Sequence, residues 1–298
     1  MSESLAHQFK SGFIVIAGAP NVGKSTLLNR LLGQKLAITS KKPQTTRNRI
    51  LGILHRPQAQ LIFIDTPGIH RSANLLNQRI VETALTAFGD VDLILILVDA
   101  QRADPEAEKL WTKALTRQRR PVVLALNKID LVPKPQLLRL IQKWQTVHPF
   151  QAIVPISAKT GEQVDDLVAE MEQTLPPGPP FFPEESLTDL PERFLVSEII
   201  REKAFRLTGE EIPYAVAVTI DLFEEQKNMV HIYATLHVER NSQKGIIIGK
   251  QGRKLKQIGA AARNDIQTML ASKVYLKLFV RVQKNWTRDT RALRRFGY

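Results

Sequence analysis

The segment Gly18–Ser25, GAPNVGKS, constrains the fold of this chain more than any other. It follows an apolar run, Phe13–Ala17, and precedes helical sequence, which is the strand–loop–helix context of a phosphate-binding loop. Glycines let backbone amides turn inward around a phosphate, and the helix start adds partial positive charge. The segment predicts a nucleotide site in which Lys24 bridges the β- and γ-phosphates and Ser25 offers its hydroxyl to Mg²⁺.

Apolar runs and amphipathic stretches alternate through the first 175 of the 298 residues. Runs that are apolar at consecutive positions are typical of strands buried on both faces of a parallel sheet. The predicted strands are Phe13–Ala17, Leu61–Ile64, Leu93–Val98, Val122–Leu126 and Ile153–Ile156, with a further strand before Leu61. The predicted helices are Ser25–Leu32, Asn77–Phe88, Pro105–Arg117, Pro135–Val147 and Val164–Thr174. We therefore expect residues 1–175 to form an α/β domain of three layers with a mostly parallel sheet.

A proline-rich segment, Leu175–Pro183, ends this pattern. Proline fixes φ and lacks an amide donor, so we predict a linker at residues 176–190. Residues 191–298 then predict a smaller α+β domain with an antiparallel, half-exposed sheet and a basic tail. Its predicted elements are a helix at Pro191–Leu207, strands at Tyr214–Phe223 and Met229–Val238, a helix at Arg253–Leu270 and a strand at Lys273–Gln283.

The net charge of +13 lies at one end of the chain. Residues 240–298 hold 15 Lys and Arg side chains and 2 Asp and Glu, whereas the preceding 239 residues are neutral overall. Such a polycation favours a polyanion partner, with nucleic acid first and an anionic membrane surface second. A merely solvated basic tail is the alternative.

Composition excludes several classes of protein. The absence of cysteine excludes disulfide scaffolds, Cys-ligated zinc and thiol catalysis. The first twelve residues have no apolar signal-peptide core, and the longest apolar run, Val91–Ala100, is too short to span a bilayer. We therefore expect a cytoplasmic protein, and secondarily a weak peripheral association with the cytoplasmic face of the inner membrane through the basic end.

Three further motifs follow predicted strands. In the first, Asp65–Gly68 (DTPG), a carboxylate can hold Mg²⁺ through water and a glycine amide can reach the γ-phosphate. In the second, Asn127–Asp130 (NKID), the Asp130 carboxylate can accept hydrogen bonds from the ring N–H and amine of guanine. In the third, Ser157–Lys159 (SAK), the Ala158 amide would meet guanine O6.

Each motif has a plain structural alternative, since Asp65 could belong to a strand-end turn and Asp130 could be a helix N-cap. Together they predict one guanine-nucleotide site, because ligands bind at the carboxyl ends of parallel strands. The predicted nucleotide-binding residues are Gly18, Ala19, Pro20, Asn21, Val22, Gly23, Lys24, Ser25, Thr26, Asp65, Thr66, Pro67, Gly68, Asn127, Lys128, Asp130, Ser157, Ala158 and Lys159.

These motifs resemble the signature set of the Era GTPases. The segment Lys42–Arg47, KPQTTR, is similar to the first switch of that family, and KNWTRD near the C-terminus is also Era-like. The segment Gly245–Gly252, GIIIGKQG, resembles the GxxG loop of a KH RNA-binding domain. The resemblance implies a P-loop GTPase domain followed by a type II KH domain.

The resemblance also implies roles for individual residues. Thr46 is the expected Mg²⁺ ligand and γ-phosphate sensor, with Thr45 as the alternative, so the expected metal ligands are Ser25, Thr46 and Asp65. Ile69 stands where Ras-like enzymes place a water-orienting glutamine, so hydrolysis needs a backbone group, another side chain, a cation or a partner. Asn21 resembles an asparagine that helps to hold K⁺ in related GTPases. The expected catalytic residues are Lys24, Asn21, Thr46 and Gly68.

The expected RNA site surrounds the GxxG loop. Glycines allow a nucleic-acid backbone to come within hydrogen-bond reach, and a basic helix follows. Ile246–Ile248 could line the groove floor or belong to the core. The predicted RNA-binding residues are Gly245, Ile246, Ile247, Ile248, Gly249, Lys250, Gln251, Gly252, Arg253, Lys254 and Lys256.

Several polar and aromatic residues outside this loop have weaker expectations. On the last strand Tyr275, Lys277, Phe279 and Arg281 point outward and either extend the phosphate footprint or form a solvated face. The same two alternatives hold for Arg288, Arg291, Arg294 and Arg295 in the tail. His231 and His237 fall on the predicted solvent face of their strand.

The resemblance to Era implies a monomeric GTPase that hydrolyses GTP to GDP and phosphate with Mg²⁺. We expect slow intrinsic turnover that is stimulated by K⁺, by RNA, or by both. It further implies binding to small-subunit (16S-type) ribosomal RNA near its 3′ end and a role in assembly of the 30S subunit. The alternative is an RNA-binding assembly factor for which nucleotide is an on/off ligand and hydrolysis is incidental.

Overall fold

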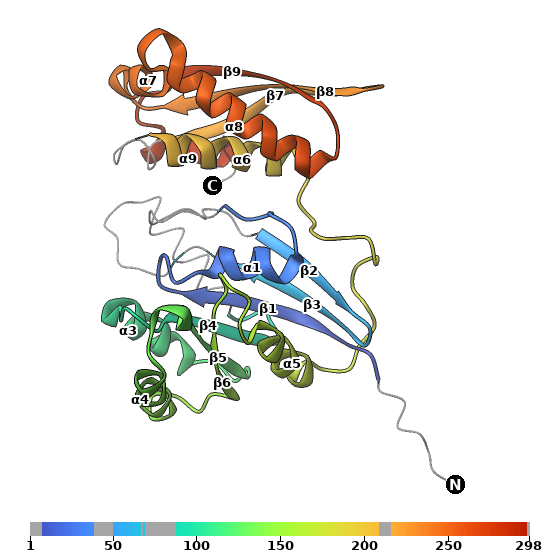
Figure 1. The fold of residues 1–298 in the computed structure, drawn as a ribbon, viewed down its shortest axis with the longest axis vertical. Helices are drawn as coiled ribbons and strands as arrows, with labels where there is room; N and C mark the ends of the chain where they lie inside the picture. The colour runs from blue at the N-terminus through green and yellow to red at the C-terminus, as the bar shows by residue number, and fades with distance from the viewer. Residues whose placement is uncertain (1–7, 39–49, 67, 69–87, 209–215, 297–298) are drawn as a thin grey trace. The chain divides into compact units, whose positions relative to one another are not determined.

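The computed structural model describes residues 8–38, 50–66, 68, 88–208 and 216–296. The expected switch residues Thr45 and Thr46, together with Pro67, Ile69 and nearly all of the predicted helix Asn77–Phe88, lie outside these ranges. The chain divides into two compact units, one of residues 1–37 and 41–189 and the other of residues 38–40 and 190–298 (Figure 1).

The first unit contains a six-stranded sheet in the order β2-β3-β1-β4-β5-β6. Every neighbouring pair is parallel except β2 and β3, which form an antiparallel pair at one edge. The strands are β1 (Lys10–Gly18), β2 (Ile50–Arg56), β3 (Ala59–Asp65), β4 (Leu93–Asp99), β5 (Val122–Asn127) and β6 (Ala152–Ile156). This confirms the predicted mostly parallel α/β sheet and supplies the expected strand before Leu61 as β2.

Helices cover both faces of this sheet (Figure 1). They are α1 (Lys24–Leu32), α3 (Pro105–Leu115), α4 (Lys134–Gln145) and α5 (Val164–Thr174). On the face of α3 and α4, Trp111 and Trp144 are almost fully buried and stack with their ring centroids 5.4 Å apart. On the opposite face α1 lies so close to β2 that a Cβ on Gly52 would be 2.6 Å from the Leu32 side chain.

Residues 176–188 run along the first unit and are hydrogen-bonded to it. The buried Gln60 side chain accepts from the amides of Phe181 (2.7 Å) and Phe182 (3.0 Å) and donates to the Phe182 carbonyl (2.8 Å). Farther along, the Thr188 hydroxyl donates to the carbonyl of Leu51 on β2 at 2.6 Å. Because the prolines of this segment have no N–H group, the segment has few backbone amides. Most of its described hydrogen bonds to the rest of the unit use those amides or its backbone carbonyls.

The second unit has a three-stranded sheet in the order β7-β8-β9 with helices on one face. Its elements are α6 (Glu192–Leu207), β7 (Ala217–Gln226), β8 (Met229–Val238), α7 (Asn241–Ile248), α8 (Arg253–Leu270), β9 (Val274–Val282) and α9 (Thr290–Arg295). Its core joins the inward residues of β8, such as Ile232 and Ala234, to Ile258, Ala262 and Ile266 of α8. These residues follow the periods of two and of three to four that a strand and a helix require.

Two expectations for this unit are wrong. The sheet is mixed, because β8 pairs antiparallel with β7 but parallel with β9. The helices α7 and α8 carry the chain back across the sheet between β8 and β9, and such a crossover makes the next strand parallel. The periodicity of one strand does not reveal the direction of its neighbour. The helix α7 is also absent from the predicted elements, because its residues 246–248 resemble a buried strand as much as a helix.

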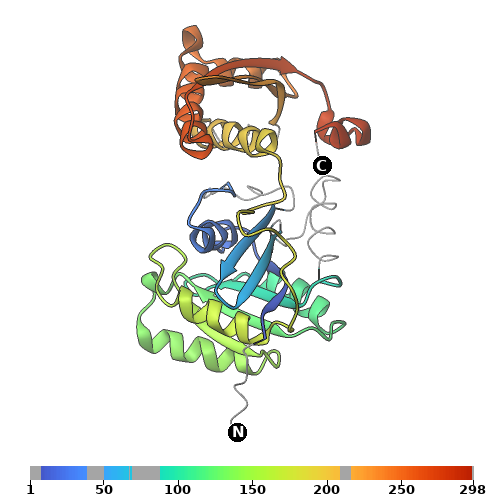
Figure 2. The same cartoon turned by 90° about the vertical axis from the view of Figure 1, so that its right-hand side faces the viewer.

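The basic tail folds against the sheet. Trp286 and Leu293 are fully buried, and the Phe296 ring lies 5.2 Å from Trp286 and 4.7 Å from His237. His237 is only 4% exposed, so its predicted place on a solvent face is wrong. The short helix α9 lies near the C-terminal ends of β8 and β9 (Figure 2). In the part of the chain that the structure describes, no helix is both long and apolar enough to cross a membrane.

Candidate functional site

The phosphate-loop segment turns between β1 and α1 on three residues with positive φ. Gly18 has φ +146° and Gly23 has φ +107°, and a Cβ on either would lie 2.3 Å from another atom, the Leu97 carbonyl oxygen and Asn127 Nδ2 respectively. Asn21 between them has φ 61°. Only glycine fits at the two ends of this loop, and glycine-turned loops of this kind direct backbone amides toward a phosphate.

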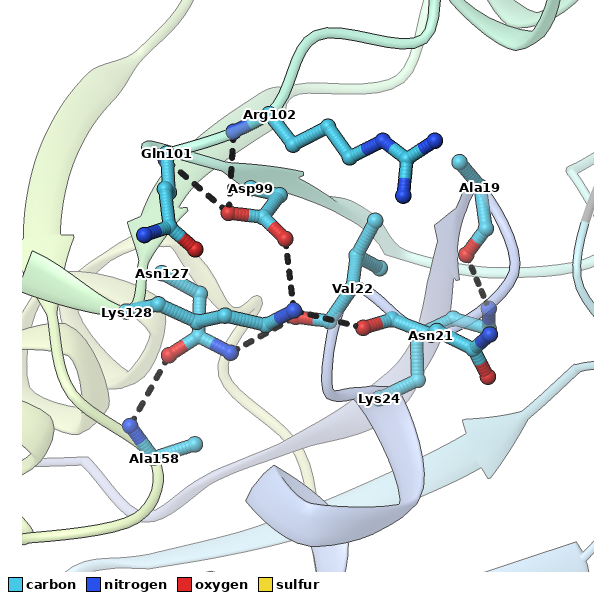
Figure 3. Close-up of polar contacts among 10 residues, drawn as sticks. All are labelled: Ala19, Asn21, Val22, Lys24, Asp99, Gln101, Arg102, Asn127, Lys128 and Ala158. Atoms are coloured by element: carbon cyan, nitrogen blue, oxygen red, sulfur yellow. Dashed lines mark hydrogen bonds and ion pairs between the residues drawn. The ribbon is translucent and has the colours of Figure 1, made fainter. Parts of the chain in front are cut away.

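Lys24 lies at the base of this loop and is 6% exposed. Its ammonium donates to the carbonyls of Gly18 (3.2 Å) and Ala19 (2.9 Å), as Figure 3 shows for the second. Burial lowers the pKa of Lys24 to about 8, and the nearby Asp65 carboxylate partly opposes this shift. The lysine therefore remains mostly protonated at neutral pH, and a phosphate beside it would favour the charged form further.

Ser25 and Asp65 form the predicted metal-ligand pair. The Ser25 hydroxyl donates to Asp65 Oδ2 at 2.8 Å, and the Asp65 side chain is fully buried at the end of β3. A hydroxyl and a carboxylate are hard oxygen donors of the kind that Mg²⁺ prefers. The residues present therefore fit Mg²⁺.

The start of the DTPG motif is held against the phosphate loop. The Thr66 hydroxyl donates to the Ile16 carbonyl of β1 at 2.8 Å. A Cβ on Gly68 would be 2.8 Å from the backbone nitrogen and Cα of Pro20, so only glycine fits this approach. The backbone at Gly68 therefore lies beside the loop, and contact of its amide with a γ-phosphate stays a prediction.

Asn127 joins the phosphate loop to the SAK motif (Figure 3). Its Nδ2 donates to the Val22 carbonyl at 2.7 Å, and its Oδ1 accepts from the Ala158 amide at 2.9 Å. Both bonds are buried, since Asn127 and Ala158 are each 2% exposed. Because Asn127 already uses the Ala158 amide, guanine O6 would have to share that amide in a three-centre bond.

Lys128 makes a second link across the site. Its ammonium donates to the Asn21 carbonyl at 2.8 Å and to Asp99 Oδ2 at 2.5 Å (Figure 3). Asp99 was not among the predicted site residues, although it ends an apolar strand in the same way as Asp65. That repeated pattern, an aspartate at the carboxyl end of a buried strand, was the signal available in the sequence.

Asp130 and Ser157, both predicted to bind the nucleotide, are in contact. The buried Ser157 hydroxyl donates to Asp130 Oδ1 at 2.8 Å and accepts from the Thr160 amide at 3.2 Å. The exposed Asp130 carboxylate is thereby oriented and keeps a second oxygen for a ligand. Arg30 at the end of α1 holds the same loop through the carbonyls of Ala158 and Lys159, a support that the motifs did not reveal.

The predicted RNA loop lies in the second unit. Residues 245–248 belong to α7, and the turn proper is Gly249–Gly252, with φ of +71° at Gly249, +53° at Gln251 and +75° at Gly252. Lys250, Gln251 and Arg253 are exposed, as a phosphate-contacting loop requires. Ile247 is fully buried in the core, whereas Ile246 is 50% exposed, so the structure separates two residues that were predicted together.

Sequence profiles of two families match the chain. The profile described as a 50S ribosome-binding GTPase matches residues 13–128, and that of the KH domain matches residues 211–287. The GTPase Era of Geotalea uraniireducens is 53% identical over 292 residues, which are 98% of each chain. The GTPase Era of Geobacter metallireducens is 54% identical over 97% of this chain and 98% of its own. This chain belongs to the Era family of GTPases.

Solved structures of the Era family agree over nearly the whole chain. A substituted variant of Aquifex aeolicus Era bound to GDP and AlF4⁻ has a TM-score of 0.94 at 42% identity, covering 97% of this chain and 99% of its own. A structure of Era with MgGDPNP and nucleotides 1506–1542 of 16S ribosomal RNA has the same TM-score and coverage at 43% identity. The predicted P-loop GTPase domain and KH domain are therefore confirmed for this Era-family GTPase.

Proposed function

We propose that this GTPase binds single-stranded RNA near the 3′ end of 16S ribosomal RNA through its KH domain and acts in assembly of the 30S subunit. A relative at 43% identity was solved with that RNA region and with MgGDPNP. In this chain the exposed loop Gly249–Gly252, followed by Arg253 and Lys254, has the backbone freedom and positive charge that such an RNA needs. The observation that carries the RNA-binding proposal is this exposed glycine turn within the segment that matches the KH domain. The buried Asn127 bridge supports the nucleotide site, because it joins the phosphate loop to the predicted base-recognition loop.

In the proposed mechanism the chain's own groups position GTP. The amides of Gly18–Ser25 and the Lys24 ammonium bind the phosphates, and Asp130, held by Ser157, binds the guanine edge. Ser25 and Asp65, with Thr46 from the first switch, would hold Mg²⁺, which supplies positive charge to the β- and γ-phosphate oxygens. The Gly68 amide would bind the γ-phosphate.

Hydrolysis requires a replacement for the water-orienting glutamine, since Ile69 cannot donate or accept a hydrogen bond through its side chain. We propose that Asn21 contributes by helping to hold K⁺ beside the phosphates. Its side chain is exposed in the loop, and Lys128 fixes its backbone through the Asn21 carbonyl. The Asn21→Ala variant should then lose the difference between its hydrolysis rates in K⁺ and in Na⁺, and a retained K⁺ preference would disprove this role.

Titrations with fluorescent GTP and ATP, with and without the 1506–1542 RNA fragment, test the main proposal. We expect GTP to bind much more tightly than ATP and the RNA affinity to change with the bound nucleotide. The Asp130→Ala variant should lose the preference for GTP, because its carboxylate supplies the hydrogen-bond acceptors that adenine does not match. Equal affinity of the native chain for GTP and ATP would contradict this site, and the absence of RNA binding would contradict the KH role.

The alternative function, an RNA-binding assembly factor with incidental hydrolysis, predicts a different result for Lys24→Ala. If the alternative holds, this variant loses hydrolysis but keeps its RNA affinity and its cellular function. If GTP hydrolysis switches RNA binding, the variant loses both. A monomer in solution is part of the proposal and is tested by light scattering. Peripheral membrane association rests only on the charge of residues 240–298, and flotation with anionic vesicles tests it.

A further inference from the structure

One face of the sheet of the second unit is covered by the tail only at the His237 end, and in the described residues it carries an unusual set of side chains farther along. Its other face is covered by α6, α7 and α8, and the inward residues of β8 and β9 form one core with these helices. On the first of these faces Tyr275 is 46% exposed and Phe279 is 40% exposed. They alternate with inward residues along β9, and across the register Tyr275 lies opposite His231 and Lys277 opposite Tyr233 of β8.

The rings of these residues contact one another and form what we term the aromatic cluster, namely His231, Tyr233, Tyr275 and Phe279. Tyr233 is central, with its centroid 6.3 Å from Tyr275 and 6.4 Å from Phe279, both edge to face. His231 lies 5.4 Å from Tyr275. Such packing holds the rings in fixed orientations, and the two outer rings, Tyr275 and Phe279, remain partly exposed.

Positive charge lies along the same strand. The Lys277 ammonium is 5.6 Å from the Tyr233 centroid and 5.4 Å from that of Phe279. The exposed Arg281 occupies the outward position after Phe279. Among the described residues, the acidic side chains of this face, Asp221 and Glu224, are on β7, which neighbours β8 and not β9. Glu224 pairs with His231, and Asp221 accepts a hydrogen bond from Thr235. The β9 side of the face is therefore complementary to an anion.

Solvent-facing sides of sheets usually carry polar side chains, so the exposed rings at alternate outward positions need another explanation. Tyr275 and Phe279 are four residues apart on a strand and hence about 13 Å apart, too far to stack on one base but suited to two different bases. Rings that alternate with basic side chains are the arrangement by which proteins bind single-stranded nucleic acid. Residues 240–298 also carry the whole net charge of the chain.

We propose that the aromatic cluster is a second RNA-binding surface, on which two unpaired bases stack on Tyr275 and Phe279 while Lys277 and Arg281 pair with the phosphates. This surface is separate from Gly249–Gly252, which joins the two helices on the covered side of the sheet. The inference rests on the proposed function in one respect, namely that this unit binds RNA. It adds a contact that tolerates any base, because every base has a face that can stack.

The test compares two RNA probes on the full chain. One is the fragment 1506–1542 of 16S ribosomal RNA, and the other is an RNA of about six nucleotides, sufficient for the KH groove. We expect Tyr275→Ala/Phe279→Ala to lower the affinity for the long RNA by about 10- to 100-fold and to leave that for the short RNA within about twofold. Tyr275→Phe/Phe279→Tyr, which keeps both rings, should bind like the native chain.

The outcomes separate the two proposals. If the native chain binds neither RNA, the proposed function fails and this inference with it. If the native and double-alanine chains bind both RNAs alike, only this inference fails. It also fails if a folded double-alanine variant loses affinity for the long and the short RNA equally. It fails likewise if the variant binds both RNAs like the native chain and loses only its binding to anionic vesicles. Ultraviolet cross-linking of the native chain gives an answer that needs no variant, since the long RNA should attach to the peptide 274–282 and its absence there would overturn the inference.

Discussion

The predicted nucleotide loop, Gly18–Ser25, and the predicted RNA loop, Gly249–Gly252, are both turned by glycines, but they are held in different ways. The nucleotide loop is fixed by side chains from distant parts of the chain, with Asn127 bonded to Val22 and Lys128 bonded to Asn21. The RNA loop is held by its own neighbours, with the Gly249 amide bonded to the Gly245 carbonyl at 2.8 Å and the Gly252 amide to the Gly249 carbonyl at 3.1 Å.

This difference matches the ligands. A triphosphate with a metal is a fixed object whose charges need donors in set positions, so a buried network that prevents rearrangement is an advantage. An RNA strand is bound along its backbone by an exposed loop, which needs space and positive charge more than rigidity. Substitutions in the first loop should therefore act through the tertiary network, and those in the second through local backbone conformation.

The largest effect is expected at Lys24. Lys24→Ala removes a buried charge beside the phosphates and should lower GTP hydrolysis by about 10²- to 10³-fold. In the native chain the pKa of Lys24 is lowered to about 8, whereas bound phosphate favours the protonated form, so GTP affinity should fall as pH rises above 8. Titration of GTP binding from about pH 7 to 9.5 measures this, and a flat profile would contradict the role of the lysine.

A somewhat smaller effect is expected at Asn127. Asn127→Ala removes the bonds to the Val22 carbonyl and the Ala158 amide and leaves two buried groups without their partner. We expect a loss of about 2–4 kcal/mol in the free energy of unfolding and a clear loss of GTP affinity. Denaturant unfolding measures the first. RNA affinity in the absence of nucleotide is the matched control, because the loop Gly249–Gly252 makes no use of this network.

Two glycines of the RNA loop provide a matched pair. Both have left-handed φ, but a Cβ on Gly249 would lie 2.6 Å from Lys254 Cβ, whereas a Cβ on Gly252 meets nothing within 4 Å. Gly252→Ala should cost only the backbone strain of about 1–2 kcal/mol, and Gly249→Ala should cost more. Filter binding of RNA should follow that order while GTP affinity stays unchanged. Equal losses in the two variants would show that space beside the loop does not matter.

The smallest effect concerns His237, which burial and the Arg295 charge keep neutral by lowering its pKa to about 4. The unfolded chain takes up a proton near pH 6.5, so the stability of the second unit is fully present above that pH and decreases as the pH falls toward 4. Thermal melting at about pH 7 and about pH 5 should show a Tm lower by several degrees at the acidic pH. His237→Gln should lessen this difference, and an unchanged difference would assign it to other groups.

Residues that share a local pattern were predictable from the sequence. The phosphate loop follows from its glycine spacing. The strand ends and the helix Arg253–Leu270 follow from apolar residues that recur with periods of about 2 and 3.6 residues. The partners of those residues were not predictable. Asp99, which pairs with Lys128, is 29 residues away from it in sequence, and Arg30 supports a loop 128 residues away. No local pattern encodes such pairs, because they depend on which strands become neighbours.

The sequence by itself determined which chemical groups this protein has and at which ends of its strands they lie, since both follow from residue type and from local periodicity. Tertiary structure alone decided that the Ala158 amide is bonded to Asn127, that β8 and β9 run parallel, and that His237 is buried, whereas the outward direction of Tyr275 and Phe279 followed from the alternation along their strand. The physical reason is that burial and pairing depend on what packs against a residue, and the helices that cover one face of a sheet are folded from other parts of the chain.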